Sequence, residues 1–140
     1  MSPFAECFNK IRLQHGVRQK DLANRMGYEQ AYISFIELDV KGPPPEAFIQ
    51  QFCKVLNLSE VEAEKLYETA EASQRKLEID GETHPDIFWM LQDIRKNLNS
   101  LSTVQIQLIR QILSIKENLK EIPMVEPRRI KRRVRQEVAM

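Results

Sequence analysis

The side chains best suited to a specific binding chemistry are four that share one face if residues 30–37 form a helix: Gln30, Ala31, Ser34 and Phe35. They are mostly short or amide-bearing. Such side chains suit a helix that lies in the major groove of DNA, where an amide can pair bidentately with adenine. This segment is therefore a candidate DNA-recognition helix.

A helix that presents this face must bury its opposite face. Ile33 and Ile36 lie there, and the segment before Gly27 has an inward face of its own. That second face consists of Leu22, Ala23 and Met26. Because Ala23 is small, the two helices can cross closely. The spacing predicts a helix-turn-helix DNA-binding unit.

The stretch resembles the lambda-repressor/Cro-like family, also called the xenobiotic-response-element type of helix-turn-helix regulator. The likeness covers about the first half of the chain and is carried by Ile11, Arg12, Gly16, Gln19, Leu22, Ala23, Gly27, Gln30, Tyr32, Ile33, Ser34, Ile36 and Glu37. The resemblance implies an all-α, five-helix domain. It also implies that Gln19 braces a phosphate, that Gln30 contacts a base edge, and that Arg12 and Glu37 form a structural ion pair.

Three residues depart from the family pattern. Arg18 stands where a Ser or Thr commonly caps the second helix, so a cap is lost and a candidate phosphate contact is gained. Glu29 replaces a small hydroxyl cap; its carboxylate suits the helix dipole but repels phosphates, unless it accepts from a cytosine amino group. Phe35 either contacts thymine methyls or is partly covered by protein. We expect Lys20 and Lys41 to contact the DNA backbone beside Arg18 and Gln19.

Start and stop signals predict the remaining helices of a domain that spans residues 1–80. Ser2 and Pro3 begin the first helix, and prolines at 43–45 precede the fourth. Ser59 and Glu62 form a capping box for the fifth, which we expect to reach about residue 77. Residues 81–85 are a predicted linker.

A second apolar series follows in residues 86–122, with gaps that alternate between four and three. Residues 97–102 are poor helix formers, so we favour two helices, about 86–98 and 103–121, folded as a hairpin; one continuous coiled coil is the alternative. A lone hairpin buries too little surface, which predicts pairing with a second copy, as a dimer or a tetramer. The predicted interface consists of Ile87, Trp89, Leu91, Ile94, Leu108, Ile112, Ile115 and Leu119.

Residues 123–140 are a predicted basic, flexible tail. Its charges are Arg128, Arg129, Lys131, Arg132, Arg133 and Arg135. Three interpretations remain open: a solvated tail, an arm that contacts DNA phosphates or the minor groove, and a site for a protein partner.

Composition and charge narrow the function classes. The net charge of +1 divides into +1 for residues 1–56, −5 for residues 57–100 and +5 for residues 101–140. The near-neutral first part predicts modest nonspecific DNA affinity. His15 and His84, the two histidines, have no partner at triad or metal spacing, so we expect no catalytic site, no metal and no cofactor. No apolar run is long enough for a membrane span, and we expect a cytoplasmic, nucleoid-associated protein.

The leading hypothesis is a bacterial or phage transcriptional repressor that binds an inverted-repeat operator as a homodimer. Two alternatives stay open. The first is the antitoxin of a toxin–antitoxin pair, in which the C-terminal helices or tail would bind a toxin. The second is a helical protein-binding adaptor that has lost DNA binding, for which Glu29 and the near-neutral charge are the only support.

Overall fold

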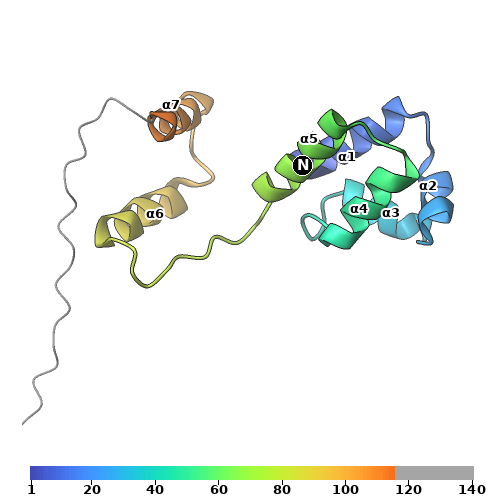
Figure 1. Cartoon of the computed structure of the whole chain (residues 1–140). Coiled ribbons are helices and arrows are strands. Elements are labelled where there is room, and N and C mark those ends of the chain that lie inside the picture. The colour runs from blue at the N-terminus through green and yellow to red at the C-terminus, as the bar shows by residue number, and fades with distance from the viewer. Residues whose placement is uncertain (116–140) are drawn as a thin grey trace, which may run out of the picture. The chain divides into compact units, whose positions relative to one another are not determined.

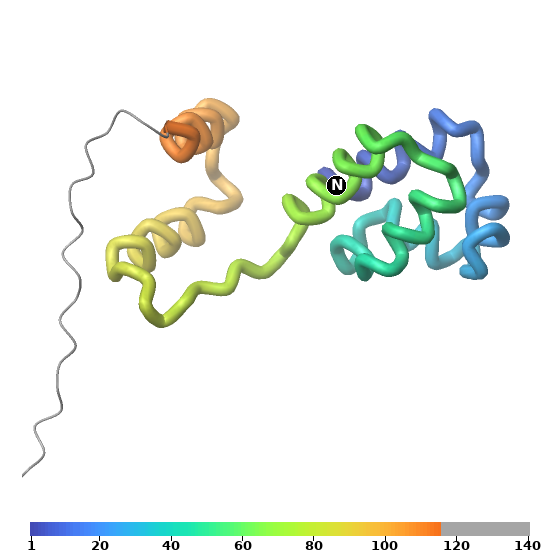
Figure 2. Tube along the Cα trace, in the orientation of Figure 1, coloured from blue at the N-terminus to red at the C-terminus, as the bar shows by residue number. Residues whose placement is uncertain are grey.

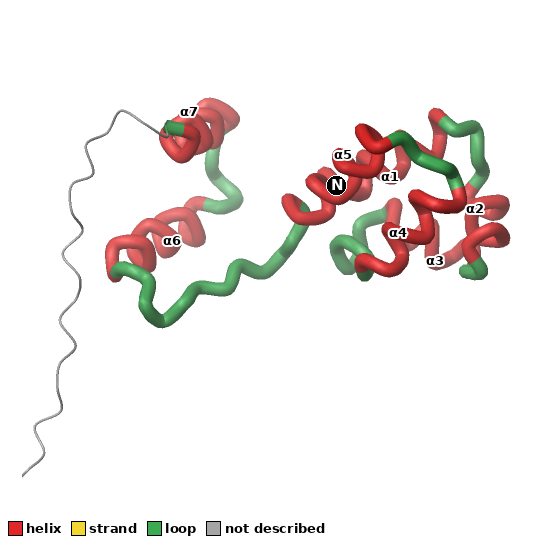
Figure 3. The backbone as a smooth tube through the Cα atoms, in the orientation of Figure 1, coloured by secondary structure: helices red, strands yellow, loops and turns green. Residues whose placement is uncertain are grey.

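The computed structural model describes residues 1–115, which form seven helices and no strand (Figures 1 and 3). The all-α prediction is confirmed for this part of the chain. The residues divide into two units, residues 1–78 and the residues from Ile79 onward. The division falls close to the predicted domain end at residue 80.

The first unit contains five helices, in the order predicted. They are α1 (Pro3–Gln14), α2 (Gln19–Met26), α3 (Gln30–Glu37), α4 (Glu46–Val55) and α5 (Glu60–Ala72). The expected caps are present: the Ser2 hydroxyl accepts from the Ala5 backbone at 3.3 Å, and Ser59 and Glu62 form both bonds of a capping box. Gly27 ends α2 with φ of 74°, a conformation that other residues rarely adopt.

Phe8 lies at the centre of the core of this unit and is fully buried. Its ring centroid is 4.5 Å from that of Phe52, 5.8 Å from that of Phe4 and 5.9 Å from that of Phe48. These rings join α1 to α4. Helix α5 packs along α1, and α2 packs against α3 and α4 (Figures 1 and 2). Helix α3, the candidate recognition helix, packs against α1 and α2.

The end of α5 differs from the prediction. We expected the fifth helix to reach about residue 77, but it ends at Ala72. The Ser73 hydroxyl donates to the Thr69 carbonyl at 2.6 Å and accepts from the Phe4 backbone amide at 2.9 Å. The start of α1 therefore holds the end of α5, and the chain turns away after Ser73.

The second unit contains α6 (Pro85–Asn97) and α7 (Thr103–Ser114). Ser102 and Gln105 form a complete capping box, which confirms a fresh helix start and rules out one continuous helix in this range. Helix α7 ends at Ser114, and residues 116–121 of the predicted second helix lie outside the described residues. Ile115 has an extended backbone, and the Ser114 hydroxyl donates to the Gln111 carbonyl at 2.7 Å.

Neither helix of the second unit has a buried residue. Within residues 79–115, α6 and α7 make no packing contact with each other. The hairpin therefore stays a prediction, although its two helices and the break between them are present. In the part of the chain that the structure describes, no helix has the length and apolar character needed to cross a membrane.

Candidate nucleic-acid interface

Helix α3 has the two faces that the sequence predicts. Ile33 and Ile36 are buried, at 0% and 4% exposure, and anchor the helix to the core. Gln30 and Ala31, in its first turn, are exposed. Ser34 and Phe35 in the expected outward set are half-buried. The exposed side-chain amide of this face, that of Gln30, thus lies at the start of α3. Helix-turn-helix proteins direct this end of the helix toward base edges.

Tyrosines before and within α3 fix its start. The rings of Tyr28 and Tyr32 stack with centroids 5.0 Å apart, and Phe48 of α4 lies edge-on to them at 5.2 and 5.6 Å. Burial, and then the neighbouring Tyr28, raise the pKa of the Tyr32 phenol. Sequence reasoning missed this cluster, because only the family resemblance singled out Tyr32 and nothing linked it to Phe48.

The two helices of the helix-turn-helix, α2 and α3, begin without a side-chain cap. Arg18 is the N-cap residue of α2 and Glu29 is that of α3, and neither side chain bonds to the first turn. The loss of the cap at Arg18 is therefore confirmed. The first amides of α2 remain available for an anion, and Arg18 and Lys20 beside them are exposed.

The resemblance implies that Gln19 braces a phosphate, but in the structure its side chain binds a carboxylate of the same domain. Its side-chain amide donates to Glu37 Oε2 at 2.7 Å. Asn9 donates to the same oxygen at 3.1 Å, and Arg12 pairs with the carboxylate through Nε and Nη2. The Arg12–Glu37 ion pair is confirmed. Gln19 is joined to it, so the placement of this amide is fixed by α1 and α3.

The Glu37 carboxyl has a lowered pKa. Burial disfavours its ionised form, but the hydrogen bonds from Arg12, Gln19 and Asn9 outweigh that cost and hold the pKa below its ordinary value of 4.5. Arg12 also donates to the Val17 carbonyl at 2.8 Å. The charge pair is therefore saturated with hydrogen bonds, as a buried pair must be.

The local charge around the helix-turn-helix is more positive than the sequence count indicates. Residues 18–41 contain four basic and four acidic residues. Two of the acids are neutralised from outside this range, Glu37 by Arg12 and Asp39 by Arg75. The four basic residues of the range form no ion pair within residues 1–115. They are Arg18, Lys20, Arg25 and Lys41. Four free cations against two free carboxylates favour a polyanion at this surface.

The predicted interface residues of the second unit are unburied. Trp89 is 69% exposed and Ile112 is 63% exposed. Leu108 and Ile115 are exposed, whereas Ile87, Leu91 and Ile94 are half-buried. Leu119 and the six basic residues of the predicted arm, from Arg128 to Arg135, lie outside the described residues.

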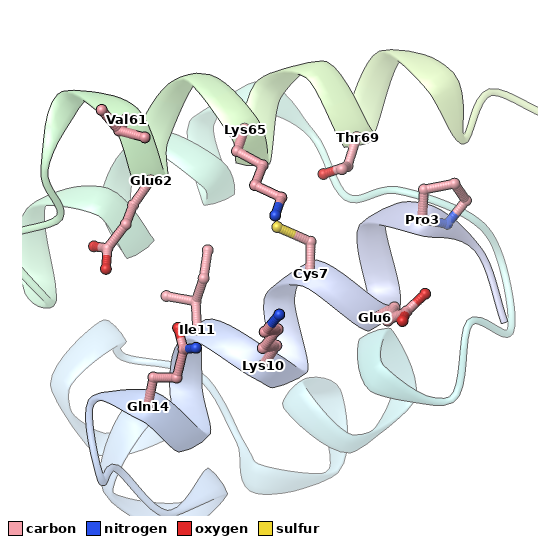
Figure 4. Close-up of a pocket in the computed structure, with 10 residues that line it drawn as sticks. All are labelled: Pro3, Glu6, Cys7, Lys10, Ile11, Gln14, Val61, Glu62, Lys65 and Thr69. Atoms are coloured by element: carbon pink, nitrogen blue, oxygen red, sulfur yellow. The ribbon is translucent and has the colours of Figure 1, made fainter.

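A groove of about 380 Å³ lies between α1 and α5 (Figure 4). Its lining residues come from those two helices and include Cys7, Ile11 and Val61. It is lined by no residue of α2 or α3, so it is separate from the candidate DNA surface. Residues 1–115 contain no cluster of His, Cys, Asp and Glu that could hold a metal ion.

Comparison with protein families agrees with this geometry. Residues 9–62 match the family model described as helix-turn-helix, a range that contains the whole of α2, α3 and α4. This part of the chain is similar to helix-turn-helix domains, and the match supports a DNA-binding transcription regulator. The lambda-repressor/Cro-like type is consistent with it. Comparisons with curated proteins and with solved structures found no match.

Proposed function

We propose that this protein is a homodimeric repressor that binds an inverted-repeat operator, with α3 of each copy in the major groove. The observation that carries the proposal is the start of α3, where Gln30 and Ala31 are exposed while Ile33 and Ile36 are buried. An amide on a helix anchored in this way can pair with adenine without the helix having to reorganise.

The other surface residues have supporting roles in this proposal. Ala31 and Phe35 supply apolar contacts to thymine methyl groups, and Ser34 contacts a base or a phosphate. Arg18, Lys20 and Lys41 contact the DNA backbone. Gln19 contacts a phosphate with the part of its amide that Glu37 leaves free.

In this proposal the second unit supplies the contacts between the two copies of the dimer. Helix α7 has apolar side chains over most of its circumference, at 100° per residue. Val104, Leu108 and Ile112 follow one side, and Ile106, Ile109 and Leu113 follow another. A helix with two apolar sides needs more than one neighbour, as in a four-helix bundle built from two copies of α6 and α7. The same surface would also support a tetramer.

Selection of binding sites from random duplex DNA at about 150 mM salt tests the proposal. We expect a two-fold symmetric consensus, whose half-sites are about one helical turn or a small multiple of it apart. A folded protein that enriches no sequence would contradict the proposal and favour the adaptor alternative.

The unburied helices of the second unit also favour a second candidate, the antitoxin of a toxin–antitoxin pair. Trp89, Ile112 and Leu113 are each more than 60% exposed and would suit a protein partner as well as a second copy. Co-expression with the product of a neighbouring gene separates the two candidates. Co-purification of that product would favour the antitoxin, and a free homodimer would favour the repressor.

A further inference from the structure

The loop between α3 and α4, residues 38–45, is held by a side chain that follows α5. Arg75 lies three residues beyond the end of α5 and three before the end of the first unit at Glu78. Its Nη1 donates to the Val40 carbonyl at 3.2 Å, and its Nη2 donates to the Asp39 carbonyl. One guanidinium thus binds two successive backbone carbonyls of the loop.

The Asp39 side chain completes this arrangement. Its carboxylate lies 3.3 Å from Arg75 Nη2 and accepts from the Ser2 backbone amide at 2.8 Å and the Ser2 hydroxyl at 2.9 Å. Asp39 has φ of 57°, in the left-handed region that costs energy for a residue other than glycine. The contacts from both ends of the first unit hold the residue in that conformation.

Gly42 brings the loop close to the same side chain. It has φ of 87°, and a Cβ built on it would lie 3.5 Å from Arg75 Nε. A side chain at this position would thus meet the Arg75 side chain, so Arg75 binds the backbone before Lys41 and lies close to Gly42 after it. Lys41 is the residue expected to contact a DNA phosphate.

Arg75 also supplies a charge that α3 lacks. The last turn of α3 has no basic residue, although cations stabilise the C-terminal end of a helix. Arg75 places its guanidinium on the carbonyls of Asp39 and Val40, the second and third residues after this helix. An arginine suits the position because its planar fork donates to two acceptors at once, which a lysine ammonium does not do in the same geometry.

We propose that Arg75 is a positioning residue for DNA binding: it holds the loop at Lys41 and couples the segment that leaves the first unit to the loop that follows the C-terminal end of α3. The proposal rests on the proposed function. It assigns to residues 73–78 a role in DNA affinity that does not require them to touch DNA.

The test compares Arg75→Ala with Lys76→Ala in the full chain. Lys76 is exposed, carries the same charge one residue later and forms no hydrogen bond or ion pair within residues 1–115, so its replacement controls for long-range attraction to DNA. We expect Arg75→Ala to bind the selected operator about fivefold more weakly than Lys76→Ala, the upper end of what an exposed ion pair contributes. Equal affinities of the two variants would overturn the proposal.

A second measurement needs no DNA. The amides of Asp39 and Val40 donate to the carbonyls of Ile36 at 3.1 Å and Phe35 at 3.5 Å. We expect these two amides to exchange hydrogen faster in Arg75→Ala and Arg75→Lys, and at the wild-type rate in Lys76→Ala. Unchanged exchange in Arg75→Ala, or full protection in Arg75→Lys, would overturn the proposed geometry.

The two measurements separate the possible failures. If the wild-type protein binds no DNA, the proposed function fails, and with it the role of Arg75 in DNA binding. If the wild-type protein binds its operator and Arg75→Ala behaves like Lys76→Ala, the proposed function stands and the role of Arg75 fails alone.

Discussion

The two units of this chain use apolar side chains in opposite ways. In the first unit, apolar residues of all five helices are buried, and Phe4, Phe8, Leu22, Ile33, Phe48, Phe52 and Leu66 are almost fully inaccessible. In the second unit, within residues 79–115, no side chain is buried and large apolar residues are exposed on both helices. The first unit has a buried core of its own, whereas the described part of the second unit exposes an apolar surface, which a second copy would cover in the proposed function.

This difference assigns separate tasks to the two units. A complete core can hold α3 at a fixed angle, which base recognition requires. An incomplete core gains stability on association, and in the proposed function the second unit is therefore the assembly element. Substitutions should therefore separate into those that unfold the first unit and those that dissociate the assembly.

The largest effect is expected from Phe8→Ala. Phe8 is fully buried among three other phenylalanines, so its truncation removes apolar burial and leaves a cavity. The cost is about 3–5 kcal/mol of unfolding free energy, measured by urea denaturation. Trp89→Ala is the matched control. We expect it to leave the unfolding transition of the first unit unchanged, and equal losses in the two variants would contradict the division.

Glu37→Gln should cost about 3 kcal/mol, because it leaves Arg12 without its charged partner in a buried site. The same residue predicts a pH dependence. The pKa of Glu37 is lower in the folded than in the unfolded protein, so its contribution is present above the ordinary value of 4.5 and is lost as pH falls through the folded value.

Urea denaturation of the wild-type protein between pH 7 and pH 3 measures this loss. We expect the variant Glu37→Gln to have a shallower decline in the acid range than the wild type. A decline of equal steepness would show that other carboxyl groups carry the acid sensitivity.

A smaller effect on free energy, confined to assembly, is expected from Ile112→Glu. Ile112 is exposed on α7, so a charge there costs the free chain little, but it would be desolvated in the proposed bundle. Sedimentation equilibrium should show dissociation constants raised about a hundredfold, or ~2.7 kcal/mol. The unfolding transition of the first unit should not move. An unchanged association constant would place the interface elsewhere.

Gln30→Ala should have the most local effect. The variant should lose about 1–3 kcal/mol on the selected operator and little on random DNA, since only the base contact is removed. Gln14→Ala, an exposed amide at the end of α1, is the control and should bind normally. Equal losses on both DNA types would make Gln30 a backbone contact.

Local signals in the sequence were sufficient for most of the fold. Caps at Ser2, Ser59 and Ser102 are set by residues within three positions of them, and each is present in the structure. Gly27 marks the turn for the same reason, because a left-handed residue is needed there. The inward residues of α2 and α3 follow from helical spacing alone.

What the sequence did not predict depends on contacts between distant residues. Arg75 binds carbonyls 35 and 36 residues earlier in the chain, and no local pattern links them. The bond from Gln19 to Glu37 similarly joins two helices through side chains that the resemblance placed separately. The early end of α5 is set by Phe4, 69 residues before Ser73.

The most direct test of the two-unit account compares two DNA duplexes, the selected operator and the same duplex with one half-site randomised. The affinity of the wild-type protein should be about a hundredfold lower for the second duplex, because α3 of one copy no longer contacts the bases that it recognises. Ile112→Glu should bind both duplexes with nearly equal affinity. If the wild-type protein binds the two duplexes with equal affinity, the claim that the second unit joins two copies of the DNA-binding first unit is contradicted.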